Sequence, residues 1–342
     1  MRFRLLSVFF FGLLLFSFHF TRAQWDDNIV VAQEWEGIYE ILLRNEFDPG
    51  VYKTAFIELN KEKLKNDTLL LAGNTYMLPE LIKTPISPKK TDADAKSNAY
   101  PIFGKKYENV PAIDNRLEGA VYYLVSGHGG PDPGAMGKYG NYTLSEDEYA
   151  YDVTLRLARN LISHGATVHM IIQDDRNGIR DDAILAMDKN ERSISNEPLP
   201  LNQRDRLKQR VDEINKLYFR NQGAFQRLIA IHVDSRSKGQ NIDVFFYHHT
   251  NSKRGEQLAR EIHKVFTAKY AKHQPNRPYH GTVSARDGLY MIKNTLPPIV
   301  YIELGNIKNY RDQLRFVTED NRQALANWIE LGIISDFENA KN

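Results

Sequence analysis

Three segments of the chain place a histidine or a glutamate at or near the end of an apolar run. His128 closes AVYYLVSGH, His232 lies in RLIAIHVDS, and Glu303 lies in IVYIELGN. Zinc accepts imidazole nitrogen and carboxylate oxygen as ligands, and a catalytic zinc site keeps one position open for water. A further carboxylate outside the coordination sphere could then take a proton from that water. These residue types therefore indicate a metal-assisted hydrolase.

Each of these residues also has a plainer interpretation. A single histidine at the end of a strand is more often structural than a metal ligand. Glu303 differs, because a carboxylate inside an apolar strand is costly to bury unless something compensates its charge. Asp132, in the sequence PDPG, is explained as a turn residue. The chain has no cysteine, which restricts any metal to His, Asp or Glu and excludes disulfides and cysteine nucleophiles.

Strand-like and helix-like patterns alternate from about residue 107 onward. Apolar runs predict strands at 120–125, 166–172, 227–233, 241–249 and 297–306, and amphipathic patterns predict helices at 145–163, 201–222, 252–270 and 319–334. This alternation favours an α/β fold with a mainly parallel, twisted sheet flanked by helices. Ligands of such sheets bind outside the carboxyl ends of the strands, so His128, His232 and Glu303 are expected to meet at one edge. The helix that begins SEDE at Ser145 would start at the same edge.

The motifs together resemble the zinc-dependent N-acetylmuramoyl-L-alanine amidases of bacteria. GHGGPDPGA, IHVDS and YIELGNIKN occur in the order typical of that family, and the resemblance covers about residues 119–332. It implies that His128, Glu146 and His232 bind Zn²⁺ and that Glu303 is catalytic. It also implies cleavage of the amide bond between N-acetylmuramic acid and the L-alanine of the peptidoglycan stem peptide.

Two glutamates compete for the third ligand position. When EDEYAYDV is laid on the family's helix, Glu146 takes the ligand position. Glu148 has a separate explanation, because Ser145 and Glu148 fit the S-x-x-E capping box that satisfies the first amides of a helix. We therefore expect Glu146 to be the ligand, with Glu148 as the alternative.

Three positions beside the motifs depart from the family pattern. Asp234 stands where the family usually has Asn, and Asn306 and Lys308 replace the usual Phe and Ser. The four residues to which the resemblance assigns the chemistry are intact. The sequence therefore predicts an active enzyme whose contacts with its substrate could differ from those of its relatives.

The first 106 residues are expected to serve export and attachment to the cell wall. Residues 1–23 combine a basic start, an apolar stretch and Ala23, as in a cleaved signal peptide, with a membrane anchor as the alternative. Residues 30–82 resemble a LysM domain, a small β-α-α-β module that binds wall glycans, through ELN at 58–60 and LLLAGNTYMLP ending at Pro79; a helical adaptor without glycan affinity is the alternative. Residues 83–106 are typical of a linker, which leaves 107–338 as the catalytic domain.

The charge balance argues against general attraction to nucleic acid or to anionic lipid. The formal charge of +2 falls to −1 when Arg2, Arg4 and Arg22 leave with the signal peptide. Peptidoglycan is the expected partner, with a protein activator as a further candidate. The expected location is the periplasm, and secretion beyond the cell is the alternative. The lack of cysteine excludes a lipoprotein anchor.

Two other functions fit the sequence less well than an amidase. A zinc peptidase of the carboxypeptidase type would show H-x-x-E, but Pro131 lies three residues after His128. A non-catalytic peptidoglycan-binding scaffold would not need the His/Glu set.

Residues 178–200 are longer than a typical connection. They are expected to form a solvated surface loop, or else a lid or inhibitory segment whose acids approach the zinc.

Overall fold

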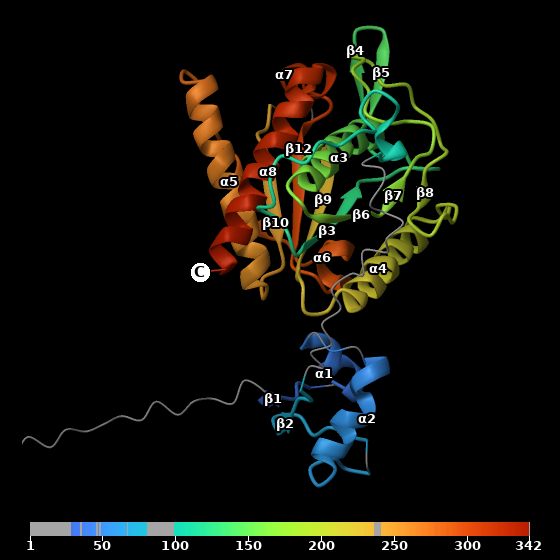
Figure 1. Ribbon diagram of the computed structural model, residues 1–342, viewed down its shortest axis with the longest axis vertical. Coiled ribbons are helices and arrows are strands. Elements are labelled where there is room, and N and C mark those ends of the chain that lie inside the picture. The colour runs from blue at the N-terminus through green and yellow to red at the C-terminus, as the bar shows by residue number, and fades with distance from the viewer. Residues whose placement is uncertain are drawn as a thin grey trace, which may run out of the picture. The chain divides into compact units, whose positions relative to one another are not determined.

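The computed structural model describes residues 29–80, 99–235 and 241–341, apart from Trp35, Glu46, Asp48 and Asp67. The chain divides into two compact units, Met1–Leu81 and Ile82–Asn342 (Figure 1). The expected signal peptide and residues 83–98 of the expected linker lie outside the described residues. A search of the described part of the chain finds no helix with the length and apolar character needed to cross a membrane.

The smaller unit has the element order β-α-α-β. It consists of β1 (Ile29–Val31), α1 (Ile38–Arg44), α2 (Pro49–Asn60) and β2 (Thr75–Met77), and β1 pairs with β2 in antiparallel fashion. The side chain of Asn60 joins α2 to β2, because it donates to the carbonyl oxygen of Met77 and accepts from its amide, both at 2.7 Å. Phe56 and Tyr76 are buried in the core of this unit. The order is that of the expected module, and its affinity for glycan stays a prediction.

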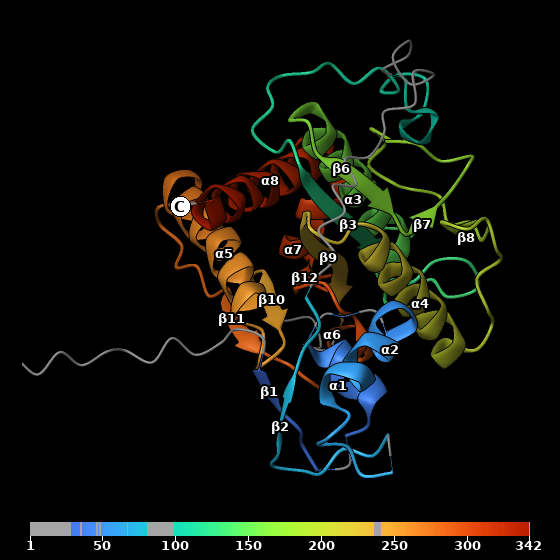
Figure 2. The ribbon, with the colours of Figure 1, turned by 60° about the horizontal axis from the view of Figure 1, so that its bottom comes forward.

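The larger unit is built on a six-stranded sheet with helices on both faces (Figures 1 and 2). Its strand order is β11-β10-β12-β9-β3-β6. The strands are β3 (Ala120–Ser126), β6 (Thr167–Met170), β9 (Phe225–Asp234), β10 (Phe245–His248), β11 (Thr282–Ala285) and β12 (Ile299–Asn306). Neighbouring strands are parallel except for the antiparallel pair β10 and β12. This confirms the expected α/β fold with a mainly parallel sheet.

Alternate side chains of the central strands enter two separate cores. On one face Leu124 and Ile231 pack with α3 (Glu146–Ser163), α5 (Lys253–His273), α7 (Tyr310–Val317) and α8 (Glu319–Lys341). On the other face Val125 and Ala230 pack with α4 (Gln203–Arg220) and α6 (Tyr290–Asn294). Since side chains alternate along a strand, His232 lies on the same face as Ala230, the face covered by α4 and α6.

Several short elements were not predicted from the sequence. A hairpin of β4 (Met136–Tyr139) and β5 (Tyr142–Ser145) lies between the GHGG loop and α3, and its pairing sets Met136 opposite Ser145. The apolar run 166–172 was expected to be one strand, but it divides into β6 and β7 (Ile172–Gln173). The reason is that β7 leaves the sheet to pair with β8 (Arg192–Ser193). The 3₁₀ helix η2 (Pro101–Phe103), β11, α6 and α7 were also not predicted.

Candidate metal centre

The loop after β3 needs glycine at two positions because site side chains occupy the space beside it. A Cβ added at Gly127 would lie 2.3 Å from Nδ1 of His232, and one added at Gly134 would lie 2.7 Å from Oε2 of Glu146. Between them His128 adopts a left-handed backbone conformation with φ of 61°, which non-glycine residues rarely adopt. The glycine-rich sequence therefore lets the loop fold closely around the histidine side chain.

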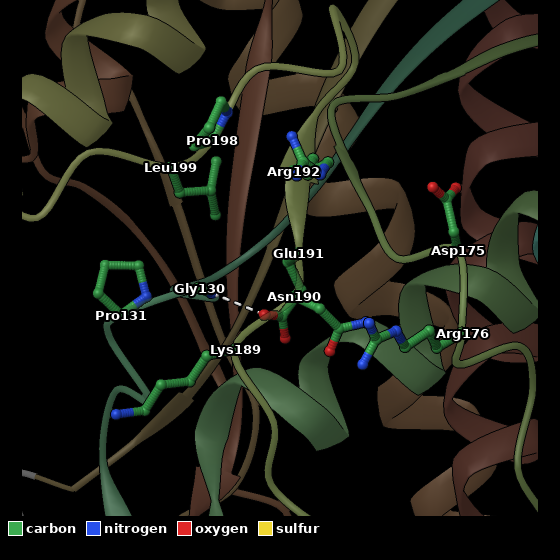
Figure 3. A pocket seen from close by; sticks show the side chains of 10 residues that line it. All are labelled: Gly130, Pro131, Asp175, Arg176, Lys189, Asn190, Glu191, Arg192, Pro198 and Leu199. Carbon is green, nitrogen blue, oxygen red and sulfur yellow. Dashed lines mark hydrogen bonds between the residues drawn. The ribbon is translucent and has the colours of Figure 1, made fainter.

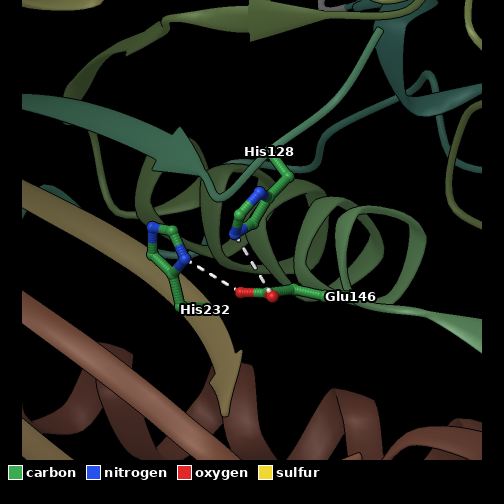
Figure 4. A group of neighbouring side chains, drawn as sticks. All are labelled: His128, Glu146 and His232. Atoms are coloured by element: carbon green, nitrogen blue, oxygen red, sulfur yellow. Dashed lines mark hydrogen bonds and ion pairs between the residues drawn. The ribbon is translucent and has the colours of Figure 1, made fainter. Parts of the chain in front are cut away.

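Glu146 lies between the two histidines and faces each of them with one carboxylate oxygen (Figure 4). Its Oε2 is 3.2 Å from Nε2 of His128, and its Oε1 is 2.9 Å from Nδ1 of His232. The two imidazole rings are 5.3 Å apart and nearly perpendicular. The three side chains offer ligand atoms that all lie within 4.8 Å of one another, so this group could hold a metal ion.

Neighbouring groups fix the orientation of each ligand. Asp132 Oδ2 lies 2.9 Å from Nδ1 of His128 and accepts a bond of 2.7 Å from Arg206. The ring of His232 stacks on Tyr301 at 4.3 Å. The amides of Ala135 and Val233 donate to the carboxylate of Glu146 at 2.8 and 3.0 Å. These contacts hold the ligand atoms in place, as second partners of metal ligands commonly do.

Asp132 orients His128 in addition to stabilising the turn expected of it. Its Oδ1 accepts from the amide of Gly134 at 3.1 Å, as a turn residue would, while its other oxygen orients His128. The spacing of four residues between His128 and Asp132 was visible in the sequence. The direction of the side chain was not, because it depends on the left-handed conformation of His128.

The charges of the group interact strongly. Burial acts to lower the pKa of His128, but hydrogen bonds to Asp132 and Glu146 outweigh it and raise the value to about 10. Burial acts to raise the pKa of Glu146, but its bonds to both histidines hold it well below the usual range. Burial lowers the pKa of His232, although the bond to Glu146 opposes the shift. The carboxylates thus attract positive charge to this point, and two nitrogens with one carboxylate are a donor set that suits zinc.

Glu303 lies beside this group on the neighbouring strand. It is 8% exposed, and its Cα is the register partner of His232 in the parallel pair of β12 and β9. Residues in register on parallel strands point to the same face of a sheet. The register shifts between Glu303 and Asn306, where Gly305 has a φ of 146°. The structure therefore brings Glu303 to the expected edge, next to the ligand group.

Glu148 does not join the group, and its expected capping function is wrong. Ser145 is the N-cap of α3, but its side chain makes no capping bond, and the amide of Glu148 donates to Asp147 instead. The Glu148 carboxylate binds Arg180 at 2.7 Å and accepts from the amide of Asp188 at 2.8 Å. Partners distant in sequence thus replace the local cap, and Glu146 is the glutamate that faces the histidines.

The segment 178–200 packs against the GHGG loop (Figure 3). Glu191 is 5% exposed, and its Oε2 accepts from the amide of Gly130 at 2.7 Å. A cavity of about 260 Å³ lies between the segment and the loop. Leu185 is also buried, which does not fit a solvated surface loop. An acid of this segment therefore meets the backbone of the histidine loop, and a lid or inhibitory function stays a prediction.

The family profile described as N-acetylmuramoyl-L-alanine amidase matches residues 123–335. The chain therefore belongs to the N-acetylmuramoyl-L-alanine amidase family. It is an amide hydrolase of peptidoglycan, and the matched region includes His128, Glu146, His232 and Glu303.

Several solved structures are similar to this chain. The CwlD amidase of Clostridioides difficile, solved with the GerS lipoprotein, is 21% identical, with 64% of this chain and 98% of that chain covered and a TM-score of 0.48. AmiC2 of Nostoc punctiforme is 18% identical, with 66% and 99% covered and a TM-score of 0.46. The catalytic domain of CwlV from Bacillus (Paenibacillus) polymyxa var. colistinus is 20% identical, with 63% and 97% covered and a TM-score of 0.45. No curated protein sequence matches the chain.

Proposed function

We propose that this amidase is zinc-dependent, with His128, Glu146 and His232 as the metal ligands and Glu303 as the group that moves the proton. The observation that carries the proposal is the Glu146 carboxylate, which faces one nitrogen of each histidine at 3.2 and 2.9 Å. Zinc bound there would polarise the lactyl carbonyl of N-acetylmuramic acid and lower the pKa of a water molecule.

The side chains around the ligands supply the remaining chemistry. With zinc bound, Asp132 would accept the Nδ1–H of His128 and so leave the Nε2 lone pair, on the side of Glu146, for the metal. Glu303 takes a proton from water as the water oxygen bonds to the carbonyl carbon. The bond from that carbon to the nitrogen of L-alanine then breaks, and Glu303 gives its proton to the departing amine. Glu303 is regenerated as a carboxylate, so one residue serves as base and then as acid.

Mass spectrometry of digested peptidoglycan tests this mechanism. The mature protein with zinc should release stem peptides that begin at L-alanine, and a chelator should stop the release. The variant Glu303→Gln should bind one zinc but lose activity by roughly 10²- to 10⁴-fold. Glu118→Gln, at an exposed position, is the matched control and should keep full activity. Full activity of Glu303→Gln would contradict the assignment, and shortened peptides still joined to muramic acid would indicate a peptidase.

We propose that the first part of the chain directs export and wall binding. Residues 1–23 would be a signal peptide that delivers the enzyme to the periplasm or beyond the cell, and residues 30–82 a LysM-like module. The β-α-α-β order of the smaller unit supports the module. A variant that begins at residue 99 should cleave a soluble muropeptide as fast as the mature chain but sediment less with peptidoglycan. Equal sedimentation of the two proteins would contradict a glycan-binding module.

A further inference from the structure

A cavity of about 140 Å³ adjoins the two histidines on the face of the sheet covered by α4 and α6. Its wall includes His128 and His232 themselves and Tyr301, on which His232 stacks. Arg206 and Arg210 line it from successive turns of α4. Because the cavity and the ligand group share both histidines, a substrate held at the metal centre would extend into this cavity within about one residue length, or 3–4 Å.

The two guanidinium groups of this cavity are not equally satisfied. Arg206 donates to the carbonyl oxygens of Pro200 and Leu201, at 2.9 and 2.6 Å, and to Asp132 at 2.7 Å. Arg210 is 4% exposed and donates to the carbonyl oxygen of His128, while its Nε has no hydrogen-bond partner among the described residues. A buried donor without an acceptor is costly, so the Nε of Arg210 can bind an acceptor that the described residues do not supply.

The charge of the lining points to an anion as that acceptor. Asp132 is the one carboxylate among the residues that line the cavity, and it is already bound to Arg206 and His128. With His128 neutral, as a metal ligand must be, the two arginines and Asp132 leave the lining with a surplus of one positive charge. The remaining wall is largely apolar, with Leu207 and Met291 among its members, which strengthens an ionic contact made inside it.

We propose, on the basis of the function above, that this cavity binds the α-carboxylate of the second stem-peptide residue and that Arg210 determines specificity for it. The second residue is a D-glutamate joined through its γ-carboxyl, so its α-carboxylate lies one residue beyond the scissile amide. The planar guanidinium of Arg210 matches a carboxylate in shape and charge. Amidation of that group to D-isoglutamine removes the charge and sets amide protons against a side chain that can only donate. The enzyme therefore prefers stem peptides with the free acid.

Calorimetry with two product dipeptides tests this assignment on the full mature protein loaded with zinc. L-alanyl-D-glutamate should bind at least about tenfold tighter than L-alanyl-D-isoglutamine. In Arg210→Met the ratio should fall to about one, while Arg204→Met, an exposed position in the same helix, should keep the wild-type ratio. Arg210→Lys keeps the charge and should retain part of the preference. This variant provides the test if the methionine variant does not fold. Equal affinity of the wild-type protein for both dipeptides, or no binding of either, would overturn the proposal.

Hydrolysis of the two corresponding muramyl dipeptides separates this inference from the proposed function. Cleavage of both with equal kcat/KM would leave the amidase mechanism standing and reject the carboxylate site. Failure to cleave either dipeptide or intact peptidoglycan, together with preferential binding of the acid, would support the site and reject the mechanism. A merely structural Arg210 would lower both rates together and leave their ratio unchanged.

Discussion

Helix α3 has a histidine–carboxylate cluster at each end, and the two clusters have opposite compositions. At its first residue, one carboxylate, Glu146, is shared by His128 and His232. At its C-cap, one imidazole, His164, is shared by two carboxylates, with Asp114 at 2.6 Å and Glu330 at 2.7 Å. Both central residues are buried, Glu146 at 4% exposure and His164 at 8%.

The ratio of imidazole to carboxylate explains why one cluster is a candidate centre and the other is structural. The two ring nitrogens of His164 each face one of its acids, Nδ1 toward Asp114 and Nε2 toward Glu330, so neither nitrogen is left for a metal. It joins α3 to Glu330 of α8. At the other end, two imidazoles and one carboxylate direct their donor atoms toward one point, and the amino end of α3 favours the charge of Glu146. The cavity of about 140 Å³ beside this second arrangement is lined by both of its histidines. The cavity beside the other cluster is lined by Glu330 but not by His164.

Matched substitutions of Glu146 and Glu330 should produce the largest difference between the two clusters. Glu146→Gln removes the one carboxylate of the candidate centre, so bound zinc and amidase activity should both be lost. Glu330→Gln removes one acid from the His164 cluster and should lower the free energy of unfolding by about 1–3 kcal/mol without changing zinc content. Elemental analysis, peptidoglycan digestion and denaturant unfolding measure the three quantities. Zinc loss in Glu330→Gln, or retained activity in Glu146→Gln, would reverse the assignment.

The aspartates that contact the histidines of the two clusters allow a finer test of the same difference. Asp132 and Asp114 each bind Nδ1 of a histidine, at 2.9 and 2.6 Å. Asp132→Asn weakens the acceptor that orients His128, so zinc affinity should fall by about 10- to 100-fold. Asp114→Asn makes the same chemical change at the structural cluster and should leave zinc affinity unchanged. Competition with a chromophoric chelator measures both, and equal effects of the two variants would deny the orienting function of Asp132.

The pH dependence of stability should also separate the zinc-free and zinc-bound proteins. In the zinc-free protein the pKa of His128 is raised from 6.5 to about 10, so its protonated form stabilises the fold fully below pH 6.5. That contribution is lost as the pH rises through about 10. Zinc binds only the neutral imidazole of His128, so the stabilisation of the fold by bound zinc should grow as the pH rises from 6.5 to about 10. Melting temperatures with and without zinc should therefore diverge between pH 7 and 10. A zinc effect that is independent of pH would contradict this, and His128→Gln should abolish both trends.

The sequence predicted those parts of the centre that follow from strand order. His128, His232 and Glu303 end or nearly end apolar runs, and a mainly parallel sheet must bring such ends together. Arg210 was not recognised, because its importance depends on an unsatisfied donor that appears only once α4 packs beside the histidine loop. Local sequence patterns specify elements, whereas contacts between distant elements decide which polar side chains find partners.

A third cluster around α3 contains carboxylates without imidazole, and a substitution there should have only a small effect. Asp147, Glu148 and Glu191 are all buried, with ligand atoms within 4.8 Å of one another. Burial raises the pKa of Glu191 to about 7. The folded protein therefore loses stability as the pH rises from 4.5 through 7 and the buried carboxyl group ionises. Glu191→Gln keeps an oxygen that can accept from Gly130 but removes this charge. The variant should melt about 2–4 °C higher above pH 7, for a gain of about 1 kcal/mol, with unchanged zinc content.

The activity of Glu191→Gln decides what the segment 178–200 does. If the segment only supports the GHGG loop, the retained bond to Gly130 should keep activity within about twofold, because a neutral acceptor loses only a modest part of the bond energy. If the segment is inhibitory and the ionised carboxylate of Glu191 holds it on the loop, the Glu191→Gln variant should release the loop. Activity would then rise several-fold while the melting temperature fell. Glu197→Gln lies in the same segment at an exposed position and should change neither quantity. Digestion of peptidoglycan at pH 8, where Glu191 is ionised in the unmodified enzyme, distinguishes the two outcomes.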